Sequence, residues 1–199
     1  MRRFALPLVL LTAACSTAPA QTVSAPAALP APSGPPQLVL AISIDQFSAD
    51  LFAQYRSHFT GGLARMLQGA VFPSGFQSHA ATETCPGHST ILTGAHPART
   101  GIIANSWYEP GGPRGAKSIY CAEDESDPAS TSRDPVVSAV HLKVPTLGEL
   151  MKVANPASRN VAISAKDRAA IMMGGHAIDA VYWWKGSGFV TLEIGRAHV

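Results

Sequence analysis

Residues 38–44, Leu-Val-Leu-Ala-Ile-Ser-Ile, form an almost continuous apolar run that ends at Asp45. Asp45 is the first formally charged residue after Arg3, so the run closes a long uncharged stretch. A short apolar run without alternation is typical of a strand that is buried on both faces, as in a parallel sheet covered by helices. This segment therefore predicts a layered α/β fold whose globular part begins at residue 38.

Helix and strand patterns alternate along the rest of the chain. Helices are predicted over residues 49–55, 62–68 and 84–92, and strands over residues 160–164, 180–185 and 189–191, the last two joined as a hairpin. A capping box, Thr146 with Glu149, predicts one more helix, which stops before Asn155. Strands that alternate with helices favour a largely parallel sheet. Functional groups of such sheets collect at the carboxyl ends of the strands, where Asp45 and residues 166–168 fall.

The N-terminus has the composition of an export signal followed by a tether. Arg2 and Arg3 precede an apolar stretch that is too short to span a bilayer. Cleavage after Ala20 would make residues 1–20 a signal peptide. Alternatively, Ala13-Ala14-Cys15 resembles a lipobox, so that residues 1–14 would be a lipoprotein signal and Cys15 a lipidated anchor. Both alternatives predict an exported protein, either soluble in the periplasm or lipid-anchored, with residues 21–37 as a Pro/Ala-rich tether.

The net charge bears on the kind of partner, and the cysteines bear on a possible disulfide. The net charge is +2, and it belongs to Arg2 and Arg3, because the other charges balance. A basic nucleic-acid footprint is absent, so we expect no nucleic-acid partner and no membrane contact except through a lipid at Cys15. In an oxidising compartment Cys85 and Cys121 either form a disulfide or stay as two buried thiols, and their spacing does not decide between the two.

Two residues stand where they could carry chemistry. Asp45, after a predicted strand, is either the cap of the next helix or an oxygen ligand for a divalent metal. Thr84, in Thr-Glu-Thr-Cys-Pro-Gly-His, has a hydroxyl at the start of a helix, where backbone N–H groups favour an anion. The alternative is that Thr84 is an ordinary N-cap. We expect His88 to be a buried, hydrogen-bonded support of this segment rather than a metal ligand.

Residues 82–88, followed by Ser-Thr-Ile-Leu-Thr-Gly, resemble the nucleophile segment of the alkaline phosphatase superfamily. The segment is most similar to that of the bacterial, threonine-using alkaline phosphatases allied to type I phosphodiesterases and nucleotide pyrophosphatases. The resemblance runs from about Leu38 to Thr191 and implies a three-layer α/β/α fold with a mostly parallel sheet. It implies that Thr84 attacks phosphorus, and that Asp45 and Thr84 ligate one of two Zn²⁺ ions.

Two further sites, three residues in all, match the phosphate-binding residues of the monoesterase branch. Asn105 matches an asparagine that binds one phosphate oxygen, and Lys166 and Arg168 match a Lys-x-Arg pair that binds the others. The resemblance therefore implies a substrate that is a small-molecule phosphate monoester, hydrolysed through a phosphothreonine. A monoester dianion has one more charged oxygen than a diester, and a cationic pair selects for it.

Other interpretations of the same residues remain open. Lys166-Asp167-Arg168 taken alone is typical of a solvated loop of mixed charge. A phosphodiesterase or nucleotide pyrophosphatase on the same fold is the nearest alternative function. A non-catalytic exported binding lipoprotein, with Asp45 and Thr84 as simple caps, is an alternative from another class.

The resemblance covers only the N-terminal part of such an enzyme. The family's other zinc ligands are Asp and His residues from a region well after Arg168, and no Asp follows Asp179 here. We therefore expect residues 38–192 to be part of a C-terminally truncated domain that is inactive and folds poorly by itself. Residues 193–199 are predicted to be a non-native tail, because Ile-Gly-Arg-Ala-His-Val is what a common sequencing adapter encodes in one frame.

Overall fold

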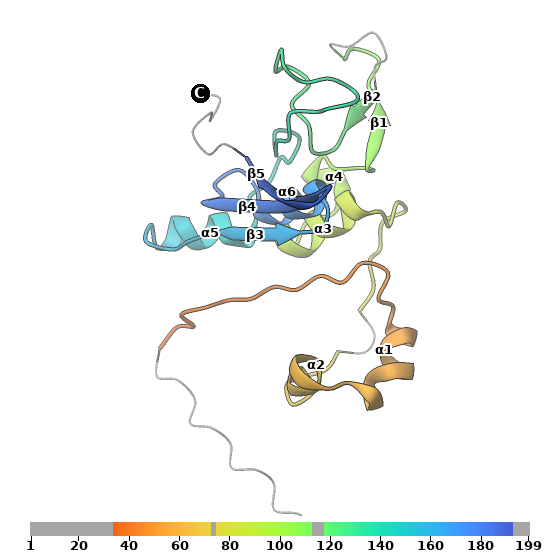
Figure 1. Ribbon diagram of the computed structural model, residues 1–199, viewed down its shortest axis with the longest axis vertical. Helices are drawn as coiled ribbons and strands as arrows, with labels where there is room; N and C mark the ends of the chain where they lie inside the picture. The colour runs from red at the N-terminus through yellow and green to blue at the C-terminus, as the bar shows by residue number, and fades with distance from the viewer. Residues whose placement is uncertain (1–33, 73–74, 113–117, 193–199) are drawn as a thin grey trace, which may run out of the picture. The chain divides into compact units, whose positions relative to one another are not determined.

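The structure is a computed structural model that describes residues 34–72, 75–112 and 118–192 (Figure 1). The chain divides into two compact units, residues 1–41 and 42–199. The expected signal peptide (residues 1–20), Cys15, most of the tether and the tail (residues 193–199) lie outside the described residues. No helix within the described ranges is long and apolar enough to cross a membrane.

Helices and strands both occur in the second unit. Its helices are α1 (Ala49–Tyr55), the 3-10 helix η1 (Arg56–His58), α2 (Gly61–Met66), α3 (Thr84–Thr93), α4 (Pro97–Thr100), α5 (Leu147–Ala154) and α6 (Asp167–Gly174). Its strands are β1 (Ser106–Tyr108), β2 (Ser118–Tyr120), β3 (Val161–Ser164), β4 (Ala180–Lys185) and β5 (Gly188–Thr191). This mixture confirms the α/β class.

The centre of the fold is a β3–α6–β4 unit. β3 and β4 pair in parallel, with Val161 opposite Ala180, and α6 is the crossover between them. β5 then pairs antiparallel with β4, which gives the order β3-β4-β5 and confirms the predicted hairpin. β1 and β2 form a separate antiparallel pair. α6 packs on β3 and β4, and α3 packs on α6.

The two faces of the β3–β5 sheet differ. On the face toward α6, Val181 and Trp183 are buried and join a core that includes Ile171 and Met172. On the other face, five large side chains remain exposed: Val161, Ile163, Tyr182, Trp184 and Phe189. Among the described residues, helices therefore cover one face of this sheet.

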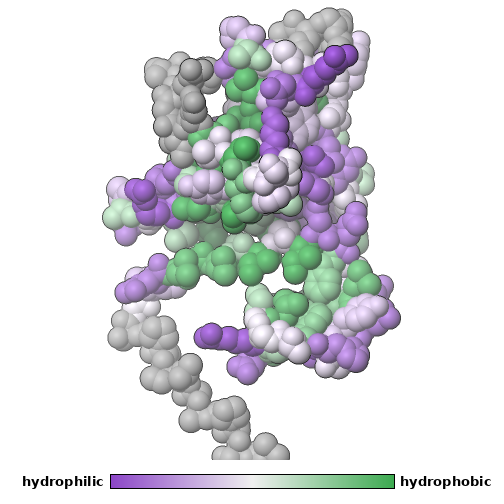
Figure 2. All heavy atoms as spheres, in the orientation of Figure 1, coloured by the Kyte–Doolittle hydropathy of each residue, from purple (hydrophilic) through white to green (hydrophobic). Residues whose placement is uncertain are grey.

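The predicted first strand is not formed. Residues 38–44 are extended, but none of them pairs with a strand of the described chain. Leu38 is 80% and Leu40 72% exposed, and Figure 2 shows this segment as a row of apolar residues. An apolar strand is buried only when neighbouring strands satisfy its backbone and helices cover its faces. The described residues supply neither, so the expectation of burial is wrong for this chain.

The other predicted elements are present with small shifts. The helix predicted at residues 49–55 is α1 with the same bounds, and residues 62–68 correspond to α2. The capping box at α5 is formed, with Thr146 Oγ1 accepting from the Glu149 N–H and the Glu149 carboxylate accepting from the Thr146 N–H. The β1–β2 pair, α4 and α6 were not predicted; for α6, only the position of residues 166–168 just past a strand end was expected.

Candidate active site

The start of α3 holds the expected nucleophile. α3 begins at Thr84 and Glu83 is its N-cap residue, so the interpretation of Thr84 as an N-cap is wrong. The Cys85 N–H donates to Asn105 Oδ1 at 2.8 Å, and Pro86 has no N–H. Of the first three helical positions, only Thr84 therefore keeps a backbone N–H for an anion. The helix end offers fewer backbone donors than the sequence predicted.

His88 lies one turn further along α3. It is 6% exposed, and its Nδ1 lies 2.7 Å from the carbonyl oxygen of Thr84. Its Nε2 lies 3.8 Å from Asp45 Oδ1. The expectation of a buried, hydrogen-bonded histidine is confirmed, and its ring also stands between the Thr84 backbone and the Asp45 carboxylate.

Asp45 is engaged by a cation instead of capping a helix. Ser48 is the cap of α1, and its Oγ accepts from the Leu51 N–H, so the capping interpretation of Asp45 is wrong. Lys166 Nζ donates to Asp45 Oδ2 at 2.7 Å. This hydrogen bond lowers the pKa of the Asp45 carboxyl below its ordinary value, against the opposing effect of partial burial and with help from the His88 charge. Asp45 is therefore an anionic oxygen donor.

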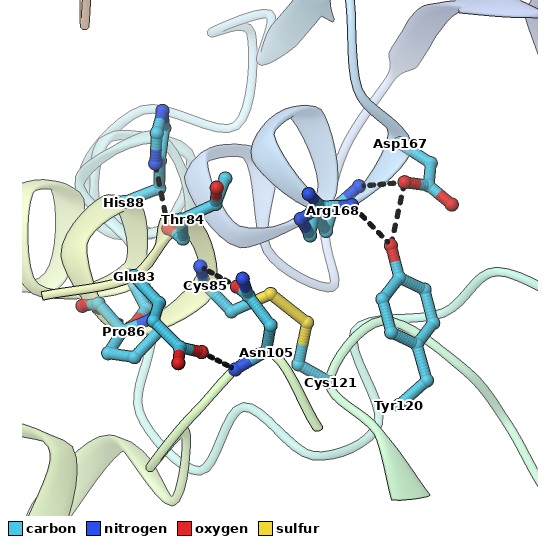
Figure 3. Close-up of a disulfide and its surroundings, with 11 residues drawn as sticks. Glu83, Thr84, Cys85, Pro86, His88, Asn105, Tyr120, Cys121, Asp167 and Arg168 are labelled. Atoms are coloured by element: carbon cyan, nitrogen blue, oxygen red, sulfur yellow. Dashed lines mark hydrogen bonds between the residues drawn. A yellow bond between two sulfur atoms is a disulfide. The ribbon is translucent and has the colours of Figure 1, made fainter. Parts of the chain in front are cut away.

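Asn105 is fixed at the start of α3 by both backbone and side chain. Its N–H donates to Glu83 Oε2 at 2.6 Å, and its carbonyl accepts from the Cys121 N–H at 3.0 Å. Cys121 and Cys85 are joined by a disulfide, with their Cα atoms 6.5 Å apart (Figure 3). The residue after Thr84 is thus covalently linked to the end of the β1–β2 pair, and Asn105 is held between the two.

Arg168 lies at the start of α6, next to two residues without an expected role. Its Nη1 donates to Tyr120 Oη at 3.5 Å, and Tyr120 Oη donates to Asp167 Oδ1 at 2.7 Å (Figure 3). Burial raises the pKa of Tyr120 to about 12, so its hydroxyl keeps its proton. Arg168 Nε is buried and has no hydrogen-bond partner among the described residues. A buried donor without a partner is costly, so this cation lacks part of its hydrogen bonding.

Two open grooves reach this cation. Arg168 and Asp167 line both of them. Lys166, Trp183 and Trp184 also line the first, whereas Tyr120 lines the second. A negatively charged ligand in either groove would therefore meet the Arg168 side of the site.

The structure brings the expected residues into two linked groups. Asn105 is bound to Cys85, the residue after Thr84, at the start of α3. Asp45 contacts Lys166 and, through His88, the same helix. Arg168 follows two residues after Lys166 and contacts the β1–β2 pair. The sequence did not indicate a role for Tyr120 or Asp167. Tyr120 only precedes a cysteine, and Asp167 lies inside a tripeptide of mixed charge, so neither belongs to a recognisable motif of its own.

The described residues do not complete a metal site. No group of three or more His, Cys, Asp or Glu side chains in the described ranges could hold a metal ion. Asp45 and Thr84 have oxygen donors of the kind that a divalent cation accepts, but zinc is held by about four ligands. The residues present therefore fit part of one metal site.

Comparison with known proteins points to one family. The family model for type I phosphodiesterase / nucleotide pyrophosphatase matches residues 39–193. The chain is 62% identical to the alkaline phosphatase PhoK of Sphingomonas sp. over 161 residues, which cover 80% of this chain and 29% of that protein. It is 54% identical to the alkaline phosphatase PhoD of Zymomonas mobilis over 159 residues, covering 78% and 27%. The chain thus spans less than a third of the curated relatives it matches.

Solved structures give the same answer. The crystal structure of wild-type alkaline phosphatase PafA superposes with a TM-score of 0.63 at 31% identity, covering 71% of this chain and 28% of that one. A second structure, with a TM-score of 0.60 at 26% identity, is a PafA variant in which a threonine, an asparagine, a lysine and an arginine are substituted. That threonine and asparagine are as far apart in sequence as Thr84 and Asn105, and the lysine and arginine are two positions apart.

Proposed function

We propose that this chain, which belongs to the type I phosphodiesterase / nucleotide pyrophosphatase family, is part of an exported, zinc-dependent alkaline phosphatase that hydrolyses phosphate monoesters through a phosphothreonine. The observation that carries the proposal is the hydrogen bond from the N–H of Cys85, the residue after Thr84, to Asn105 Oδ1 at the start of α3. The names of the relatives, all alkaline phosphatases among those described above, support the reaction class. The four residues altered in the PafA variant support the choice of site.

Asn105 is oriented for an anion. Because Asn105 Oδ1 already accepts from the Cys85 N–H, its amide nitrogen, which has two donors, is left for another partner. With Pro86 lacking an N–H, the backbone supplies little, so a phosphate at Thr84 depends on side-chain donors. We infer that Asn105 donates to one phosphate oxygen beside the Thr84 hydroxyl.

Lys166 and Arg168 account for the preference for monoesters. Arg168 Nε lacks a partner, and hydrogen bonds between a guanidinium and a phosphate are among the strong ones in proteins. Lys166 is 44% exposed and reaches Asp45 in the structure, so its ammonium can turn to a ligand without being drawn from a buried position. Two cations on the phosphoryl group would favour the dianion of a monoester over the monoanion of a diester.

Zinc would complete the site. Bound there, two zinc ions would supply the positive charge that stabilises the attacking and leaving oxygens. We propose that Asp45 and Thr84 contribute two ligands to one ion. The other ligands would come from the part of the relatives that this chain does not span, and on this proposal the 199-residue chain alone is inactive.

The reaction steps assigned to this chain are few. Thr84 Oγ loses its proton and bonds to phosphorus while the bond from phosphorus to the ester oxygen breaks, and the departing alcohol takes up a proton. Asn105, Lys166 and Arg168 hold the three non-bridging oxygens as the charge on them redistributes. Water then attacks the phosphothreonine, which releases inorganic phosphate and restores the Thr84 hydroxyl.

The first test removes the nucleophile. In the complete enzyme, obtained from the genomic locus, Thr84→Ala should lower turnover of an aryl phosphate by at least about 10⁴-fold. Thr84→Ser keeps a hydroxyl and should retain part of the activity and form a phosphoserine detectable by mass spectrometry. Chelation should abolish turnover and zinc should restore it. Unchanged activity of Thr84→Ala would instead favour a non-catalytic binding protein.

The second test separates monoesterase from phosphodiesterase. The family to which the chain belongs is named for phosphodiesterases, which is the specific reason to test phosphodiesterase activity as the alternative. Lys166→Ala and Arg168→Ala should each lower kcat/KM for the monoester about 10- to 100-fold and affect an aryl diester far less. Equal losses on both substrates would support the phosphodiesterase alternative.

Export is a separate part of the proposal. It rests on the composition of residues 1–20 and on the alternative lipobox at Cys15. Mass spectrometry of the mature protein from the native host would distinguish a chain that starts at Gln21 from one that carries a lipid at Cys15. A chain that keeps Met1 would contradict both alternatives.

A further inference from the structure

The hydroxyl of Tyr120 bridges the two charged residues at the start of α6. It donates to Asp167 Oδ1 at 2.7 Å and accepts from Arg168 Nη1 at 3.5 Å. Asp167 Oδ1 also accepts from the Arg168 backbone N–H at 2.7 Å, so a single oxygen atom fixes both the tyrosine and the first turn of α6. Of the partners that the described residues offer to the Arg168 guanidinium, Tyr120 is the only one for which a hydrogen bond is found.

The backbone of Tyr120 is anchored to the nucleophile end of α3. Tyr120 is the last residue of β2, opposite Ser106 in the pair that follows Asn105. The next residue, Cys121, forms the disulfide to Cys85, which follows Thr84. The Cys121 N–H also donates to the Asn105 carbonyl. Tyr120 thus stands on a strand that is tied covalently and by hydrogen bonds to the two residues assigned to attack and to bind phosphate.

Packing alone does not account for the hydroxyl. The ring of Tyr120 is partly buried against the core, a contact that phenylalanine would make equally well. A tyrosine hydroxyl in a partly buried place usually has a hydrogen-bond partner. Here the hydroxyl has two partners in a defined geometry, because it donates its proton to Asp167 and accepts a hydrogen bond from Arg168.

We propose that Tyr120 is a positioning residue for phosphate-monoester recognition, which sets the Arg168 guanidinium relative to Thr84 through the disulfide-linked β2 strand. The inference rests on the proposed function, because it assumes that Arg168 binds the phosphoryl group. Tyr120 does not touch the reacting atoms. It restricts the directions in which Arg168 presents its remaining donors, which lowers the ordering cost when the dianion binds.

The experiment compares variants of the complete enzyme on an aryl phosphate monoester and an aryl phosphate diester. Tyr120→Phe should lower kcat/KM for the monoester about tenfold, the effect of one hydrogen bond to a charged group, and should leave the diester nearly unchanged. Asp167→Asn, which weakens the acceptor of the tyrosine proton, should shift the ratio of the two activities in the same direction. Tyr108→Phe, an exposed tyrosine on β1, is the matched control and should change neither activity.

A double-mutant cycle with Arg168→Ala isolates the positioning role. If Tyr120 acts through Arg168, adding Tyr120→Phe to Arg168→Ala should cost little further monoesterase activity. A full additional loss in that background would overturn the inference, as would equal losses on monoester and diester or an unaffected Tyr120→Phe enzyme. If Thr84→Ala and Arg168→Ala themselves left monoesterase activity intact, the proposed function would fail first, and the two failures are therefore distinguishable.

Discussion

Residues 34–72 and residues 85–192 differ in how much they bury. No described residue before Cys85 is buried, although the earlier segment contains the most apolar run of the described chain and two helices. After Cys85 the chain buries Ile102, Ile119, Leu142 and most of α6. Apolar composition alone therefore does not make a core; a segment also needs partners that satisfy its backbone and cover its surface.

Local interactions still shape the exposed segment. α1 has a Ser48 cap, and Phe47, Phe52 and Phe59 cluster with ring centroids 5.9–6.2 Å apart. Caps and aromatic pairs stabilise a helix by about 1 kcal/mol each, which is small against the cost of ordering a chain. We expected the chain alone to fold poorly. Residues 34–72 are the part of the described chain that lacks buried side chains, so we expect them to be the least stable part.

Breaking the disulfide should have the largest effect on the well-packed region. Cys85 and Cys121 are 36 residues apart, and closing a loop of that size constrains the unfolded chain by about 4 kcal/mol. Cys85→Ala with Cys121→Ala should lower the free energy of unfolding by about that amount in urea titrations of the complete enzyme. Hydrogen exchange should show the loss at α3 and β2, with α1 unchanged. An equal loss of protection at α1 would mean that the two regions unfold as one.

A pair of matched truncations tests the contrast in burial directly. Ile171→Ala removes a side chain that is 1% exposed on α6 and should cost about 3 kcal/mol of unfolding free energy. Leu51→Ala removes a side chain that is 40% exposed on α1 and should cost less than about 0.5 kcal/mol. Similar costs, measured by the same urea titration, would show that Leu51 is buried in solution and would remove the difference.

The acid sensitivity of the packed region should depend on Glu149. Burial raises the pKa of its carboxyl, but hydrogen bonds from the N–H groups of Thr146, Ala177 and His176 outweigh this and hold the pKa below its ordinary value of 4.5. A lowered pKa in the folded state stabilises the fold above pH 4.5, and the stabilisation is lost as the pH falls through the folded-state value.

Glu149→Gln tests that linkage. At pH 7 the variant should be less stable by about 2 kcal/mol, since a buried charged acceptor with several donors is lost. The difference should shrink as the pH is lowered below 4.5, when the native carboxyl also becomes protonated. A difference that stays constant between pH 7 and pH 3 would show that the carboxylate charge does not contribute.

The smallest effect is expected for an exposed ion pair. Lys185 Nζ lies 3.1 Å from Asp134 Oδ1, and both side chains are at least 66% exposed. Solvent and salt screen such pairs, so Lys185→Ala should change the unfolding free energy by less than about 0.5 kcal/mol. A larger loss that vanishes at high salt would show that this pair is coupled to the packed region.

Sequence patterns predicted the elements that depend on local chemistry. The capping box of α5 and the β4–β5 hairpin follow from residues a few positions apart, and both formed as predicted. β1 and β2 were missed because each has only three residues, too few for an alternation to stand out. α6 was missed because, after Asp167 and Arg168 at its start, its residues are all small or apolar, so that no polar face marks the segment as a surface helix.

The site was predictable in part for the same reason. Four of the site residues belong to short motifs that can be matched to a family: Thr84, Asn105, Lys166 and Arg168. Their roles remain predictions that the proposed experiments test. The contacts of Tyr120 with Arg168 span 48 positions and depend on how β2 meets α6. Sequence spacing does not predict the contact between Tyr120 and Arg168, because tertiary packing produces it.

Pro86 has a consequence for how such a site can change over time. With one backbone donor removed by the ring and another taken by Asn105, the helix end fixes where the attack occurs but says little about which anion is held. On the proposed function, selectivity then lies in side chains on other elements, which can be exchanged one at a time without remaking α3. The same nucleophile could serve monoesters in one lineage and diesters in another.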